Sequence, residues 1–67
     1  MASSTDPFNE LLIALDLYEA QRDDEIDLKQ SDIVRLIEKR YPKWWLGRNE
    51  RTLKVGYFPV RLVKSWR

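Results

Sequence analysis

The aromatic side chains are the residues of this sequence best suited to binding chemistry. Trp44 and Trp45 are adjacent, and Tyr57 and Pro59 follow in the same stretch, residues 43–59. Neighbouring side chains in a β-strand point to opposite faces of the sheet. Only one tryptophan can therefore enter a one-sided core, and the other must face outward. A bulky aromatic on the exposed face of a small sheet predicts a surface that contacts another molecule.

The residues that most often carry catalysis or bind metals are absent from the sequence. It contains no histidine and no cysteine, which excludes a disulfide framework and a thiolate metal site and removes the commonest general base. The spacing of the remaining Asp, Glu, Tyr and Lys residues suggests no convergent pair for acid–base catalysis. We therefore expect a binding protein that is not an enzyme and uses no metal or cofactor.

Length and composition indicate one small folded domain. The chain has 67 residues, of which 43% are hydrophobic and 34% charged, a balance typical of a folded domain rather than a disordered one. No apolar run approaches the roughly 20 residues of a membrane span, and the first residues lack the pattern of a secretory signal. We expect a soluble protein of the reducing cytoplasm.

The charges are divided along the sequence. Residues 6–32 hold nine acidic and two basic side chains, whereas residues 35–67 hold ten basic and two acidic ones. This division can let the two halves of one small fold attract each other. The alternative is that the acidic residues form a recognition loop.

The strands that would position these side chains can be read from the apolar pattern. Residues 11–15 form a short apolar run, and within residues 23–28 the last four alternate acidic and aliphatic side chains. Residues 33–37 are rich in β-branched types. Residues 43–59 read as a β-hairpin with its turn at residues 48–52, where Asn49 can take a left-handed conformation. Residues 60–63 form a helical turn or a last short strand, and a helix over residues 8–21 competes with the first strand.

These elements predict a small antiparallel barrel or sandwich with a defined core. The expected core residues are Ala14, Ile26, Val34, Leu36, Val55 and Phe58. Residues 10–64 are expected to form the domain, with residues 1–9 as a flexible N-terminal extension and residues 65–67 as a C-terminal tail.

Four segments, in order, resemble the Src-homology-3 (SH3) domain, a five-stranded barrel that binds proline-rich peptides. Residues 14–18, ALDLY, look like the family's opening ALYDY, and residues 23–28, DDEIDL, look like its acidic RT loop and closing strand. Trp44 and Trp45 with Gly47 look like the double-tryptophan strand, and residues 56–59, GYFP, look like the segment before its 3₁₀ turn. The match covers residues 12–63 and implies an all-β, small five-stranded SH3-like barrel with a short 3₁₀ turn.

The resemblance also implies a binding groove. In the family, aromatic ridges hold a peptide in the polyproline II conformation, which is already extended and loses little entropy on binding. A carboxylate of the RT loop pairs with a Lys or Arg of the peptide; Glu25 matches that acid, and Trp45 matches the tryptophan that packs on the other face. The site residues implied in this way, with two acids close to Glu25 and two departures from the pattern, are Asp16, Tyr18, Asp23, Asp24, Glu25, Trp44, Tyr57, Pro59 and Leu62.

Three positions depart from the family pattern. Asp16 and Leu62 stand where two tyrosines would together wall one proline pocket. A carboxylate there would favour a cation, which predicts a ligand with more Lys or Arg and fewer essential prolines; the alternative is that Asp16 lies at the rim in water and the site is merely weak. Ser31 replaces a usual turn glycine, so the turn there is strained or of another type.

The expected partner is a proline-rich or basic linear peptide motif, bound with micromolar affinity, about −8 kcal/mol or weaker. The domain would be monomeric in isolation and part of a larger signalling, scaffold or cytoskeletal adaptor protein. Alternatively, the domain binds a partner surface that lacks the proline motif, or it associates with a second copy of itself. Residues 35–54 also combine basic side chains with aromatics, as in barrels that stack nucleic-acid bases. Acids beside Trp44 would repel phosphates, so we expect no nucleic-acid binding.

Overall fold

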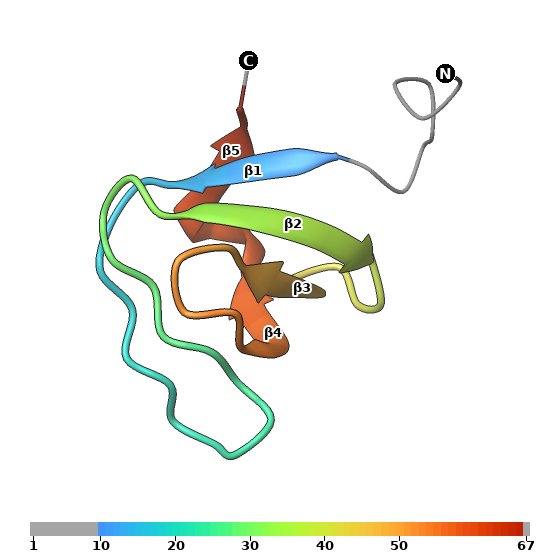
Figure 1. The fold of residues 1–67 in the computed structure, drawn as a ribbon. Coiled ribbons are helices and arrows are strands. Elements are labelled where there is room, and N and C mark those ends of the chain that lie inside the picture. The colour runs from blue at the N-terminus through green and yellow to red at the C-terminus, as the bar shows by residue number, and fades with distance from the viewer. Residues whose placement is uncertain (1–9, 67) are drawn as a thin grey trace.

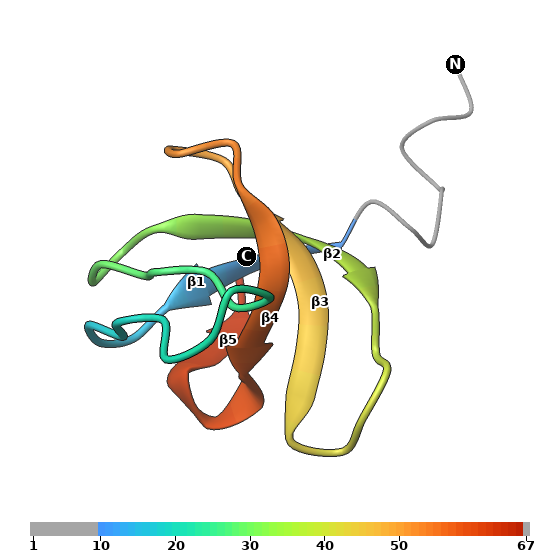
Figure 2. The ribbon, with the colours of Figure 1, turned by 90° about the horizontal axis from the view of Figure 1, so that it is seen from below.

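The computed structural model describes residues 10–66 and contains one curved, five-stranded antiparallel sheet (Figure 1). The strands are β1 (Leu11–Ala14), β2 (Ile33–Glu38), β3 (Trp44–Asn49), β4 (Val55–Pro59) and β5 (Val63–Ser65), and the short 3₁₀ helix η3 (Val60–Leu62) joins β4 to β5. In the sheet they lie in the order β4-β3-β2-β1-β5 and curl around a small interior, as the view from below shows (Figure 2). The expected all-β fold, a small five-stranded barrel with a 3₁₀ turn, is confirmed.

The core follows the alternation of side chains along the strands. In β1 and in the first four residues of β2 every second residue is buried, which places Leu12, Ala14, Val34 and Leu36 inside. Strand β1 also shows that the competing helical interpretation of this stretch is wrong. The buried hydrophobic residues of the described chain are Leu12, Ala14, Ile26, Leu28, Val34, Leu36 and Phe58. Five of the six predicted core residues are therefore confirmed.

Val55 is the exception, because its side chain is 56% exposed. It is the first residue of β4, and its partner in β3 is Arg48. Phe58 is fully buried and Gly56 lies on the same face, so the two-residue period of the strand turns Val55 outward. The strand was predicted correctly, but Val55 lies on its outer face, so the prediction of Val55 as a core residue was wrong.

The β3–β4 hairpin decides which tryptophan faces the core. Trp45 and Gly47 share one face of β3, and a Cβ atom on Gly47 would lie 2.8 Å from the Phe58 ring, so that face is filled by the core. Trp45 packs at the margin of this core, with Lys39 Nζ 4.8 Å from its ring centroid. Trp44 therefore points to the opposite face, where its strand partner is Pro59.

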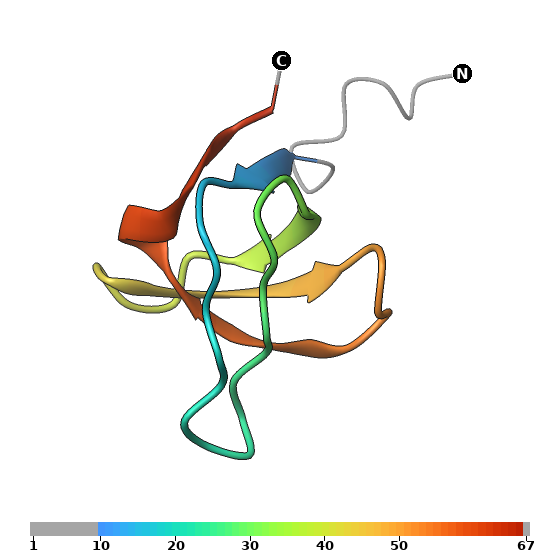
Figure 3. The same ribbon diagram turned by 90° about the vertical axis from the view of Figure 1, so that its left-hand side faces the viewer.

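Residues 15–32, here called the RT loop, form a long excursion between β1 and β2 that projects from the barrel (Figure 3). The strand expected over residues 23–28 is wrong: only the isolated bridges Tyr18 to Leu28 and Glu25 to Tyr57 are present. A hydrogen bond from Glu25 N to Arg22 O closes a turn at the tip, which ends the extended run. Ile26 N donates to the Tyr57 carbonyl of β4, and Tyr57 N donates back to the Asp24 carbonyl, so the loop covers that edge of the sheet.

Two turns contain non-glycine residues with positive φ. Ser31 has φ of 74°, in the left-handed region, where a residue with a Cβ atom carries a steric cost that glycine does not. In the β3–β4 hairpin the left-handed residue is Leu53, with φ of 66°, and not Asn49 as the sequence suggested. Asn49 ends β3 in extended conformation and is fully buried. The Asn49 side chain forms hydrogen bonds inside the fold, so the left-handed conformation occurs at Leu53, later in the turn.

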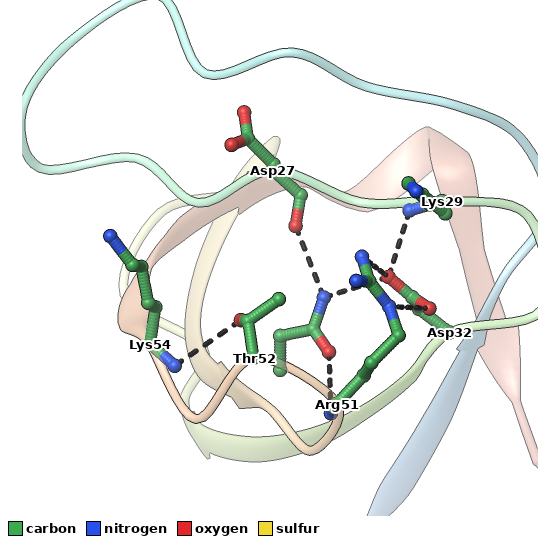
Figure 4. A network of polar contacts seen from close by, with 7 residues as sticks. Asp27, Lys29, Asp32, Arg51, Thr52 and Lys54 are labelled. Carbon is green, nitrogen blue, oxygen red and sulfur yellow. Dashed lines mark hydrogen bonds and ion pairs between the residues drawn. The ribbon is translucent and has the colours of Figure 1, made fainter.

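The buried Asn49 belongs to a polar cluster that joins the base of the RT loop to the β3–β4 hairpin (Figure 4). Asn49 Nδ2 donates to Asp32 Oδ2 (2.8 Å) and to the Asp27 carbonyl (3.1 Å). Arg51 donates to both Asp32 oxygens at 2.8 and 2.9 Å, and the Lys29 amide donates to Oδ2 at 2.8 Å. These donors, the Arg51 guanidinium first, hold the pKa of Asp32 well below its usual range.

Candidate functional site

Trp44 is the centre of the candidate site. It lies at the start of β3 and directs a half-buried indole to the face opposite the core. Tyr18, from the RT loop, packs against it edge-on, with ring centroids 6.1 Å apart and ring planes at 65°. Pro59 is its partner at the end of β4. Residues distant in the sequence thus form one aromatic and proline ridge, which offers flat apolar surfaces to a ligand.

On the RT-loop side of Trp44 there is a hollow of about 380 Å³, here called the loop hollow. It is lined by Arg22, Asp24, Glu25, Tyr41, Trp44 and Tyr57. The rings of Tyr41 and Tyr57 lie 5.9 Å apart and form its aromatic wall. Two carboxylates against one guanidinium leave the lining with a net negative charge, which favours a cationic group.

Glu25 is held in place by hydrogen bonds within the RT loop. Its Oε1 atom accepts the Tyr18 hydroxyl at 2.6 Å and the Gln21 amide at 2.8 Å. The Tyr18 hydrogen bond, followed by that of Gln21, lowers the pKa of Glu25, so this carboxyl is ionised at neutral pH. Burial, and then the same hydrogen bond, raise the pKa of Tyr18 to about 12. This pair fixes both the RT loop and the edge of the aromatic ridge.

A second hollow, of about 440 Å³, lies toward η3 and is here called the turn hollow. It is lined by Pro42, Lys43, Trp44, Pro59, Val60 and Arg61. The Val60 amide donates to the Lys43 carbonyl at 3.0 Å, which joins the turn to the segment before β3. Trp44 is the one residue that lines both hollows, so the two meet at its indole.

The structure brings together six of the nine predicted site residues around the indole. These are Tyr18, Asp24, Glu25, Trp44, Tyr57 and Pro59. Asp16, Asp23 and Leu62 line neither hollow. Asp16 is exposed and its Oδ1 accepts the amide of Leu17 at 2.7 Å, while half-buried Leu62 accepts the Leu15 amide through its carbonyl.

Several lining residues were absent from the sequence-based site. They are Arg22, Tyr41, Pro42, Lys43, Val60 and Arg61. The adjacent Tyr41 and Pro42, just before the two tryptophans, are an aromatic and proline pair that the sequence could have indicated. Arg61 offered no such signal, because only the turn of η3 directs it to the same hollow as Lys43.

Two further kinds of feature are absent from residues 10–66. That part of the chain contains no group of three or more acidic, histidine or cysteine side chains that could hold a metal ion. It also contains no helix long and apolar enough to span a membrane.

Comparisons with known proteins agree with this geometry. The SH3 domain family model matches residues 13–60. Nostrin from Rattus norvegicus is 39% identical over 57 residues, which cover 85% of this chain and 11% of nostrin. The myosin IC heavy chain from Dictyostelium discoideum is 38% identical over 53 residues, which cover 79% of this chain and 4% of that protein. The chain therefore spans only a small part of these relatives.

A solved structure shows the same fold with a ligand present. The C-terminal SH3 domain of myosin IB from Entamoeba histolytica, bound to a peptide, has a TM-score of 0.79 and 30% sequence identity, over 88% of this chain and 95% of that one. The protein described here belongs to the SH3 domain family. Members of this family are interaction modules rather than enzymes.

Proposed function

We propose that this domain binds a short, extended, proline-rich or basic peptide segment of a partner protein across Trp44. The observation that carries the proposal is the position of the indole, which lies on the outer face of β3 and lines a hollow together with Asp24 and Glu25. An aromatic ridge suits proline rings, and the carboxylates suit a Lys or Arg of the ligand. The related SH3 domain of myosin IB bound to a peptide supports this function.

The acidic side of the groove is suited to a cation through two different carboxylates. Glu25 Oε1 accepts the Tyr18 hydroxyl and the Gln21 amide, and a hydrogen bond from the Arg22 backbone also favours the ionised carboxyl. The side chain of Asp24 is exposed and lines the same hollow. A ligand cation can therefore bind in this hollow beside the exposed carboxylate of Asp24 and the ionised Glu25. Phosphates of a nucleic acid would be repelled from the same surface, which favours a peptide as the ligand.

The second proline pocket expected from the family would be weak in this chain. Asp16 is exposed, Leu62 is half-buried, and neither supplies an aromatic ring. Proline side chains at that end of the groove would find less flat apolar surface than beside Trp44. We infer that basic residues contribute more, and prolines less, to recognition by this domain than the family pattern implies.

A peptide panel and one substitution test the proposal. Peptides with a proline core, with and without added Lys or Arg, are titrated into the domain while tryptophan fluorescence is recorded. Basic peptides should bind with micromolar dissociation constants, and Trp44→Ala should weaken them at least about tenfold. Trp66→Ala is the matched control, because Trp66 is exposed and lines neither hollow. Unchanged binding by Trp44→Ala would refute the proposed groove, and preference for the peptide without basic residues would refute the inferred specificity.

The setting of the domain is part of the same proposal. We infer that residues 10–64 act as a monomeric module in a longer cytoplasmic signalling, scaffold or cytoskeletal protein, as their similarity to a segment of a myosin heavy chain suggests. Sedimentation over a wide range of concentrations tests the monomer. A mass that rises with concentration, and falls again when peptide is added, would instead favour self-association through the groove.

A further inference from the structure

The turn hollow carries charge of the opposite sign from the loop hollow. Lys43 and Arg61 are its two charged residues, and no carboxylate lines it. Within residues 10–66, Arg35, Lys39, Arg40, Arg48 and Arg51 each pair with an acid, whereas Lys43 and Arg61 have no ion pair. Two unpaired cations that line one hollow repel each other, and an anion between them would interact favourably with both.

The rest of the turn hollow is apolar and built on paired backbone. Pro42, Trp44, Pro59 and Val60 form its walls. The strand pair Trp44 and Pro59 and the hydrogen bond from Val60 N to Lys43 O hold these walls together. The hollow is therefore formed before any ligand arrives, and the entropy lost on binding is reduced. Its chemistry fits a side chain with an apolar stem and a negative end.

The positive charge of Arg61 reaches the peptide groove itself. Its field acts on the Tyr18 hydroxyl, where it favours the ionised form and opposes the larger effects that raise the pKa of Tyr18. Tyr18 in turn packs against Trp44 and bonds to Glu25. One aromatic ridge thus lies between the cations of the turn hollow and the carboxylates of the loop hollow.

We propose that the turn hollow binds a Glu or Asp side chain of the same peptide whose basic residue enters the loop hollow. This inference rests on the peptide-binding function proposed above and makes it more specific. The two hollows meet at Trp44, so one extended chain, which advances about 3 Å per residue, reaches both. The preferred ligand is then a peptide of unequal charge, basic at one end of its core and acidic at the other, and its charges decide its direction across Trp44.

Three peptides that differ at one position test this. All have the same proline-rich core with an arginine at one end, and the other end carries Glu, Gln or Lys at several spacings from the core. At low salt the domain should bind the Glu peptide about three- to tenfold more tightly than the Gln peptide, and the Lys peptide more weakly than both. The preference should decrease as salt is added.

Substitutions in the protein locate the effect. Lys43→Gln combined with Arg61→Gln should abolish the preference for Glu, and Lys43→Glu combined with Arg61→Glu should reverse it in favour of Lys. Lys54→Gln is the matched control, because Lys54 is exposed and lines neither hollow. Lys43 and Arg61, the two side chains altered in both double variants, are exposed and have no ion pair within the described residues, so thermal melting should show folded proteins.

The possible failures are distinguishable. Equal binding of the Glu and Gln peptides, with both lost in Trp44→Ala, would overturn the acidic subsite and leave the peptide-binding function standing. A preference for Glu that survives the double Gln variant would also overturn it. Absence of binding by every peptide, or full binding by Trp44→Ala, would overturn the peptide-binding function itself.

Discussion

The base and the tip of the RT loop use the same residue types for different purposes. At the base, Asp32 is buried and accepts hydrogen bonds from Lys29, Asn49 and Arg51. At the tip, the side chains of Asp23 and Asp24 are exposed and form no hydrogen bond or ion pair with the described residues. Glu25 lies between these extremes, with one oxygen committed to the loop.

The difference follows from the environment of each carboxylate. A buried charge must be fully hydrogen-bonded because water cannot solvate it, and over residues 10–66 every buried side-chain N or O atom has a partner. An exposed carboxylate at the tip is solvated by water, so leaving it without a protein partner costs little folding free energy. Stability and recognition therefore depend on separate residues of one loop, and substitutions should affect one without the other.

The largest expected effect comes from removing the carboxylate at the base. Asp32→Ala leaves the fully buried Asn49 amide with the Asp27 carbonyl as its one acceptor and removes both acceptor oxygens from the Arg51 guanidinium. We expect the free energy of unfolding to fall by about 3 kcal/mol, as measured by urea denaturation. Asp24→Ala, at the tip, should change it by less than about 0.5 kcal/mol. Similar losses of stability in both variants would contradict the separation of stability at the base from recognition at the tip.

Low pH should also reduce the stability of the fold by protonating Asp32, but by less than Asp32→Ala does. The pKa of Asp32 is lower in the folded chain than its unfolded value of about 3.9. Such a group adds stability above its unfolded pKa, and this stability is lost as the pH falls below about 4 toward the folded value. The stability of Asp32→Asn, followed by thermal melting, should depend less on pH over this range. A pH dependence as steep as that of the original protein would assign the loss to other carboxyls.

Relief of backbone strain at the base should stabilise the fold by a smaller amount. Ser31 is held at φ of 74° while its amide bonds to the Ala14 carbonyl. Ser31→Gly removes the steric cost of this conformation and should raise the free energy of unfolding by about 1 kcal/mol. Peptide affinity should stay the same, because Ser31 lines neither hollow. A loss of stability would show that the conformation is not strained.

The smallest effect is expected where the tip meets the groove. Tyr18→Phe removes the hydroxyl that bonds to Glu25 but keeps the ring beside Trp44. The pKa of Glu25 should rise toward its ordinary value, as followed by NMR of the side-chain carboxyl, while the melting temperature changes little. Tyr57→Phe serves as control, since its hydroxyl forms no hydrogen bond with Glu25. An unaltered Glu25 titration in Tyr18→Phe would mean that the pair is not formed in solution.

Local patterns were sufficient for most of the strands and for the prediction that one of the two tryptophans faces outward. That this residue is Trp44 was implied by the family resemblance and follows in the structure from the β3–β4 hairpin. Alternating apolar residues over β1 and β2, and the paired tryptophans of β3, carry their information within a few neighbours, because strand geometry repeats every two residues. The same local logic failed at Val55, where the phase depends on which residue of β4 meets the core. It failed again at residues 23–28, where the turn at Arg22 and the edge of β4 override the strand-like alternation.

For the candidate site, the amino-acid types already indicated an aromatic surface with acids beside it and excluded histidine and cysteine chemistry. Only the folded chain could place Asn49 and Arg51 against Asp32, or Arg61 in the same hollow as Lys43. These residues are separated by 17 or more positions, and their meeting depends on how the sheet curls and where the RT loop and η3 cross it. Short-range sequence patterns do not predict such contacts, because side chains far apart in the sequence are brought together only when the whole core packs.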